Sequence, residues 1–74
     1  MAPEDIRALP IGTRVLVKRA TMKVAENATI IARPSKHHAE EHPYYRWVRF
    51  DGSGIPEIRE VQVGFMDIKS VIPA

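Results

Sequence analysis

The amino-acid sequence predicts an all-β fold, a small antiparallel barrel of five short strands with a 3₁₀ turn before the last strand. Three observations support this prediction. Short β-branched and apolar runs recur along the chain, turn-forming Gly, Pro and Asn residues separate them, and no stretch has the periodicity of a long helix. A chain of 74 residues has room for one domain with a thin core.

The N-terminal residues 1–10 are predicted to form a tail ahead of a barrel domain of residues 11–74. Within the tail, Pro10 leaves space for one helical turn at most. The first strand is predicted at residues 14–19, where apolar and basic side chains alternate. A β-bulge would allow residues 20–24 to extend this strand, because the apolar positions change parity there.

The second strand is predicted at residues 29–33, a β-branched run that Pro34 ends because proline cannot donate to a β-ladder. Residues 25–28 are its predicted connection to the first strand. Residues 35–43 are polar throughout and are predicted to form a loop. Both connections are therefore expected on the surface.

The third strand lies in the stretch from Tyr44 to Gly54, which combines aromatic and β-branched residues with a glycine-rich turn signal. Successive side chains alternate across a strand, so Val48 and Phe50 are predicted to face the core. A shift of one residue would exchange the two faces. The opposite face then carries Tyr45, Trp47 and Arg49.

The fourth strand is predicted at residues 58–63, with Val61 and Val63 facing inward. Residues 65–68 are too few for an α-helix and are predicted to form one 3₁₀ turn. Residues 69–72 then form a brief closing strand, which completes the set of five.

The order of these motifs resembles the SH3-like barrels of the Tudor and KOW kind over residues 11–72. The resemblance implies a small β-barrel of five strands. Fold alone does not specify function, so it implies no single activity. The matching motifs are Gly12-Thr13-x-Val15-x-Val17, Ala28 to Ala32, Tyr45 to Gly52, and Phe65-x-x-Ile68.

The outward face of the third strand is the predicted binding site, joined by arginines from the neighbouring strands. Aromatic rings beside guanidinium groups can stack on bases and contact phosphates, or hold a proline-rich peptide. Nucleic acid and protein therefore stay open as alternative partners, as does a structural role in which Trp47 covers one end of the barrel. The predicted binding residues are Tyr45, Trp47, Arg49, Arg33 and Arg59.

Composition limits the other function classes. The absence of cysteine excludes disulfides and thiolate metal sites and fits a reducing compartment. No run approaches the length of a membrane span and the first residues lack an apolar signal region, so a cytoplasmic location without a membrane partner is predicted. A net charge of +2 does not by itself indicate nucleic acid. The thin core makes a homo-oligomer a possible source of stability.

The histidines His37, His38 and His42 lie beside two glutamates, and imidazole is a common zinc ligand. No zincin motif accompanies them and Pro43 follows directly, so a solvated loop is favoured and no metal is predicted. The serines lack a nucleophile-elbow context, and the glycine-rich turn is not followed by a helix. No catalytic residue and no cofactor are predicted.

An enzymatic alternative depends on a second resemblance. The stretch Val61-Gln62-Val63-Gly64 resembles the Val-Gln-Ile-Tyr stretch in the substrate pore of type II dihydrofolate reductases, which are also SH3-like barrels of similar length. The resemblance implies that Gln62 and Val63 line a pore shared by a homo-oligomer. Gly64 stands where that family has the tyrosine that helps bind cofactor and substrate.

Overall fold

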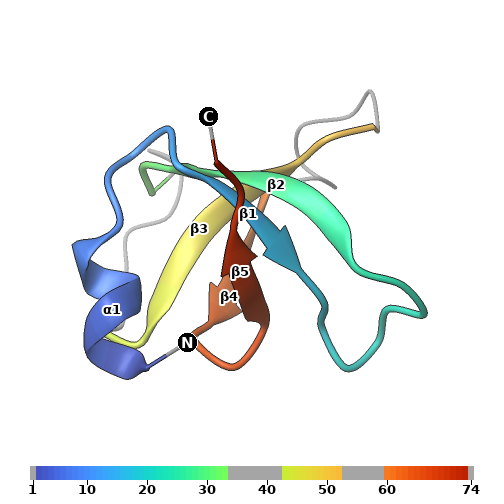
Figure 1. The fold of residues 1–74 in the computed structure, drawn as a ribbon, viewed down its shortest axis with the longest axis horizontal. Helices are drawn as coiled ribbons and strands as arrows, with labels where there is room; N and C mark the ends of the chain where they lie inside the picture. The colour runs from blue at the N-terminus through green and yellow to red at the C-terminus, as the bar shows by residue number, and fades with distance from the viewer. Residues whose placement is uncertain (1, 34–42, 53–59, 74) are drawn as a thin grey trace.

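The computed structural model describes residues 2–33, 43–52 and 60–73. They form one short helix and five strands (Figure 1). The elements are α1 (Pro3–Ala8), β1 (Arg14–Val17), β2 (Glu26–Ile31), β3 (Tyr45–Phe50), β4 (Glu60–Gly64) and β5 (Ile68–Val71).

The strands form a single antiparallel sheet in the order β4-β3-β2-β1-β5. The predicted all-β fold with five antiparallel strands is confirmed. The last strand does not pair with its predecessor in the chain but with β1, where Val15 lies opposite Val71. β1 is therefore paired with a neighbouring strand on both sides.

The sheet is strongly curved because its two outermost strands are joined by only three residues, Phe65 to Asp67. In a flat sheet β4 and β5 would lie four strand spacings apart, roughly 19 Å. The connection closes instead as a tight turn in which Asp67 N donates to Gly64 O at 3.0 Å, which brings the turn's ends within about 7 Å. A hydrogen-bonded turn at residues 65–67 thus stands where a 3₁₀ turn over residues 65–68 is predicted, and Ile68 already belongs to β5. No ladder joins β4 to β5 in the part of the chain that the structure describes.

The core lies on one side of the sheet and receives side chains from every strand and from α1. The predicted inward positions on β3 and β4 are confirmed, since Val48 is fully buried, Val63 is 1% exposed, and Phe50 and Val61 pack against them. The fully or nearly fully buried set is Ile6, Val15, Val17, Ala28, Ile30, Val48, Val63 and Ile68.

The N-terminal stretch expected as a tail contributes Ile6, which is 0% exposed. The helix begins with Pro3 at a position where no N–H is needed, and it ends at Ala8, ahead of Pro10. Six residues are too few to form a stable helix in isolation. α1 therefore depends on contacts with the sheet, and it packs against β3 (Figure 1).

A cation on the core side of β3 fastens α1 to the sheet. Arg46 shares its face of β3 with Val48, two residues further on. Its guanidinium Nη1 donates to Ile6 O at 2.9 Å and to Leu9 O at 2.8 Å. These carbonyls belong to the end of the helix, where the partial negative charge of the helix dipole favours a cation.

The predicted strand boundaries shift at the β1–β2 connection. β1 ends at Val17, and residues 20–24 do not extend it through a bulge. A turn occupies this place, closed by Met22 N donating to Arg19 O at 3.0 Å. The prediction of a connection at residues 25–28 is wrong from Glu26 onward, because β2 begins there and pairs with β1. An irregular register occurs instead between β1 and β5, at Leu16 and Val17.

Several predicted features lie outside the described residues. They include most of the loop predicted at residues 35–43, the second half of the Asp-Gly-Ser-Gly turn, and the first residues of the predicted fourth strand. In the described ranges, no helix has the length and apolar character needed to cross a membrane.

Candidate functional site

The predicted binding face of β3 has the expected register. Tyr45, Trp47 and Arg49 alternate with the inward-facing Val48, so they share the opposite face of the strand. Their surroundings differ. Tyr45 is 43% exposed, whereas Trp47 is only 8% exposed. Only the tyrosine can therefore offer an open ring to a partner.

Trp47 lies between two partly buried neighbours, with Ile31 opposite it on β2 and Gln62 opposite it on β4. It does not belong to the main core cluster on the other side of the sheet. The large apolar side chain is thus covered on its own face. This burial agrees with the structural role that the sequence left open for Trp47.

Arg49 is paired with a carboxylate in register. Its Nε and Nη2 atoms donate to Glu60 Oε2 at 3.1 and 2.8 Å, and the two residues lie directly opposite each other on β3 and β4. The glutamate side chain is only 16% exposed. The positive charge expected for phosphate contact is therefore largely neutralised at this position.

A second ion pair crosses the same sheet. Arg14 donates to Asp51 through both terminal nitrogens, and its Nη1 also donates to Thr29 Oγ1 at 2.7 Å. The hydrogen bond to Asp51 raises the pKa of Arg14 above its ordinary value. Because that pKa is raised, the arginine stays charged at every physiological pH.

The remaining predicted arginines contribute less to a common site. Arg33 is exposed and lies two residues beyond Ile31, the β2 residue opposite Trp47, so it lies at the Tyr45 end of the β2–β3 ladder. Arg59 lies outside the described residues. The five predicted binding residues are thus not assembled into one exposed aromatic and basic surface by the part of the chain that the structure describes.

A different group of side chains gathers where β3 begins and β4 ends. Tyr44, Tyr45 and Met66 are 46%, 43% and 72% exposed, and Phe65 lies partly buried among them. Phe65 N donates to Tyr44 O at 3.0 Å, and the two rings meet edge to face with centroids 6.1 Å apart. We call Tyr44, Tyr45, Phe65 and Met66 the tyrosine patch.

The patch surrounds a shallow hollow of about 240 Å³, lined by Tyr45, Gly64, Phe65, Met66 and Asp67. Gly64 lies directly opposite Tyr45, and a Cβ on this glycine would be 2.7 Å from Tyr45 Cε1. The missing side chain thus lets the tyrosine ring lie against the backbone of β4. Asp67 fixes the turn, since its Oδ2 accepts from Gly64 N at 3.0 Å.

Sequence reasoning identified Tyr45 but missed the rest of the patch. Met66 and Phe65 were assigned to a turn, and a turn residue carries no strand pattern that would show which way it faces. The signal was the antiparallel pairing of β3 with β4. It places Gly64 opposite Tyr45, so the turn that follows β4 lies beside the start of β3.

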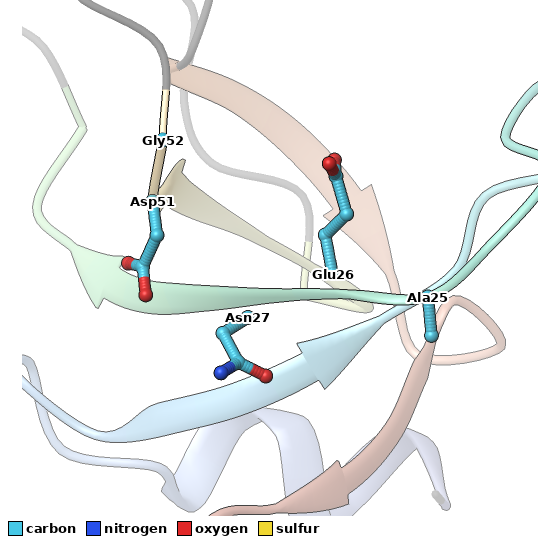
Figure 2. Close-up of a pocket in the computed structure, with 5 residues that line it drawn as sticks. All are labelled: Ala25, Glu26, Asn27, Asp51 and Gly52. Carbon is cyan, nitrogen blue, oxygen red and sulfur yellow. The ribbon is translucent and has the colours of Figure 1, made fainter.

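A second hollow, of about 310 Å³, lies between the start of β2 and the end of β3 (Figure 2). It is lined by Ala25, Glu26, Asn27, Asp51 and Gly52. Figure 2 shows the side chains of Glu26 and Asn27 on opposite sides of the strand. The Asp51 carboxylate is bound by Arg14. These polar groups therefore do not converge on a common point, so we regard the tyrosine patch as the candidate site.

The structure also bears on the other chemistries considered. Val63, which the reductase resemblance places in a pore, is buried in the protein's own core, while Gln62 is partly buried opposite Trp47. His37, His38 and His42 lie outside the described residues. Across residues 2–33, 43–52 and 60–73 no group of His, Asp and Glu is arranged to hold a metal ion.

Comparisons with protein-family models, curated proteins and solved structures found no match to this chain. The function is therefore argued from the chemistry of the site.

Proposed function

We propose that this protein is a small SH3-like barrel that acts as a non-enzymatic binding module and holds a partner macromolecule at the tyrosine patch. The barrel assignment is supported by the antiparallel strand order and by the three-residue link between the outer strands. Such a link curves the sheet toward closure.

The observation that carries the proposed role is a group of neighbouring apolar side chains at one hollow. The exposed Tyr45 and Met66 line it together with Phe65, and the exposed Tyr44 packs its ring against Phe65. Single exposed apolar residues are common on soluble proteins, but a contiguous group is characteristic of an interaction site. Tyrosine and methionine are also enriched at interfaces, because they offer a large contact area and adapt to a partner.

The site is displaced from the predicted one but keeps one of its members. Trp47 is buried and Arg49 is paired with Glu60, so neither is presented in the way a stacking or phosphate-binding residue requires. Tyr45 belongs to both surfaces. The binding face thus moves from the middle of β3 to its beginning.

Binding hot spots can be detected without knowing the natural partner, because small aromatic fragments collect in the same hollows. We would titrate ¹⁵N-labelled protein with a set of aromatic fragments and follow the backbone amide signals by NMR. The expected result is a set of shifted amides at Tyr45, Gly64, Phe65 and Asp67. Fragments that shift other regions of the sheet, or none, would contradict the proposal.

A pair of matched variants sharpens this experiment. Met66→Asp places a charge in the patch, while Val24→Asp places the same charge at another exposed apolar residue, 67% exposed and outside the patch. We expect Met66→Asp to abolish fragment binding and Val24→Asp to leave it unchanged. Equal losses in both variants would show that the effect comes from overall charge rather than from the patch.

A further inference from the structure

Four cations belong to the two segments that contact the turn of the tyrosine patch. Lys18, Arg19 and Lys23 belong to the connection between β1 and β2, and Lys69 is an exposed residue of β5. We call these four residues the basic rim.

The basic rim differs in its charge pairing from Arg14, Arg49 and Arg46. Arg14 is paired with Asp51, Arg49 with Glu60, and Arg46 with the carbonyls at the end of α1. In contrast, no ion pair forms at any of the four rim residues among the described parts of the chain. The rim therefore keeps its positive charge available for a ligand.

Two hydrogen bonds fix the rim next to the hollow. Lys18 N donates to Asp67 O at 2.9 Å, which ties the end of β1 to the turn that lines the hollow. The ammonium group of Lys69 donates to Met66 O at 3.0 Å, so this charge lies beside the exposed methionine. Lys18 and Lys69 therefore flank the turn that lines the hollow, and Arg19 follows Lys18 directly along the chain.

The β1–β2 connection is also an ordered segment. Its tight turn is closed by Met22 N donating to Arg19 O at 3.0 Å, and Met22 Sδ accepts from Arg19 N at 3.3 Å. Lys18 and Arg19 precede this turn and Lys23 follows it. The turn therefore holds the cations of the connection as a group.

We propose that the tyrosine patch and the basic rim together bind single-stranded nucleic acid, with bases stacked on the tyrosine rings and phosphates contacted by the rim. This inference rests on the proposed function and names the class of its ligand. Proteins that bind single strands without sequence preference combine these two features. Bases stack on their aromatic rings, and a positively charged groove contacts the phosphates. A carboxylate-rich peptide would satisfy the rim but leave the flat rings without their preferred partner.

A single strand fits the surface better than a duplex. Stacking on Tyr45 needs a base that is unpaired and open on one face, and duplex bases are stacked on each other. The expected order of affinity is therefore single strand first, then duplex.

The test is a fluorescence anisotropy titration of the full chain with labelled single-stranded DNA and RNA of roughly 10 nucleotides, a duplex of equal length, and a polyglutamate peptide of equal charge. Contact with three or four phosphates predicts a slope of log K against log salt of about −2 to −3. We expect the single strands to bind more tightly than the duplex and the peptide.

Three variants assign the binding to this surface. Replacing Lys18, Arg19 and Lys23 together with glutamine should weaken the slope by about 2, because up to three phosphate contacts are lost. Tyr45→Leu keeps an apolar side chain but removes the ring, and should weaken binding between about fivefold and a hundredfold. Arg49→Gln, whose charge Glu60 already neutralises, is the control and should leave the affinity unchanged.

Several outcomes would overturn the inference. Among them are tighter binding of polyglutamate or of the duplex, equal losses in the Arg49→Gln control and in the rim variant, or no binding of single strands at low salt. Fragment binding at the patch in the absence of nucleic-acid binding would refute this ligand class while leaving the proposed function standing. The rim substitutions are on exposed or half-buried loop positions, so a retained thermal unfolding transition would show that the fold is intact.

Discussion

Replacing Arg46 with methionine should undock α1 from the sheet. The substitution keeps the length of the aliphatic side chain but removes the donors that bind Ile6 O and Leu9 O at 2.9 and 2.8 Å. A hydrogen bond involving a charged group contributes about 1.5–3 kcal/mol, and partial exposure favours the lower value. We therefore expect Arg46→Met to lower the free energy of unfolding by about 3 kcal/mol.

That loss would be a large part of the total free energy of unfolding. A core of this size seldom supplies more than about 3–5 kcal/mol, so the variant should retain about 0–2 kcal/mol and be between a few per cent and half unfolded at room temperature. The assay is equilibrium urea denaturation followed by the fluorescence of Trp47, the only tryptophan, which is 8% exposed in the folded state. Arg49→Met is the matched control, because its partly exposed pair with Glu60 should be worth about 0–1 kcal/mol.

A double-mutant cycle tests the mechanism itself. Ile6→Val should cost about 0.5–1.5 kcal/mol in the natural chain, because Ile6 is fully buried. If Arg46 acts by holding the helix, the same change should cost almost nothing once Arg46 is replaced by methionine. An Ile6→Val cost that is the same in both backgrounds would refute this reasoning, since it would show that the helix stays docked without the guanidinium.

Three further predictions concern the sheet and its turns. Gly64→Ala should destabilise the fold by about 1–3 kcal/mol in urea denaturation, because its Cβ would be 2.7 Å from Tyr45 Cε1, and a Tyr45→Ala background should remove most of this cost. Gly52→Ala should cost about 1–2 kcal/mol and Gly52→Asn less, because φ is +91° and no atom lies within 4 Å of the added Cβ; equal costs would show that the backbone is not the cause. The stability difference between the natural chain and Arg14→Gln should be constant from neutral to mildly alkaline pH, because the pKa of Arg14 is raised above its ordinary value, so the Arg14–Asp51 contribution is intact below that ordinary value and is lost only as the pH rises above it; a difference that shrinks before that range would contradict the raised pKa.

The sequence was a good guide to the strands whose residues are both β-prone and alternating. β1 and β3 lie where Val15, Val17 and the aromatic run place them, and the inward positions Val48 and Val63 follow from alternation. The beginning of β2 escaped prediction for a physical reason. Glu26 and Asn27 have low strand propensity, and their exposed side chains carry no core pattern; pairing with β1 makes them a strand.

Local sequence patterns do not predict that α1 packs against the sheet, although one residue indicated it. Ile6 and Leu9 are the two large apolar residues of a six-residue stretch bounded by prolines, which is too short for a periodicity to mark Ile6 as core. Arg46, however, shares the face of β3 predicted to point inward with Val48 and Phe50. A cation on a core face needs a partner, and carbonyls at the end of a nearby helix are a suitable one.

The candidate site was likewise predicted only in part. Tyr45 was predicted because alternation places it outward, and Trp47 was placed on the same face for the same reason. Alternation determines the face but not what covers it, so the burial of Trp47 could not be predicted. Met66 became part of the site because the register of β3 and β4 places the end of β4 beside Tyr45, and a local pattern does not specify that register.

The pairing of β1 with β5 also has a consequence for how the chain folds. Val15 and Val71 are neighbours in the sheet although 56 positions separate them along the chain, as 71 − 15 = 56. Closing so long a loop costs conformational entropy before the contacts between the two strands can stabilise it. Pairing of this kind therefore slows folding. The hairpin pairs β1–β2 and β3–β4 can form first, and the last strand then completes the sheet by joining the first. Until that step, the edge of β1 stays open to strands of other molecules, which makes the last pairing both the slowest and the most exposed to competing association.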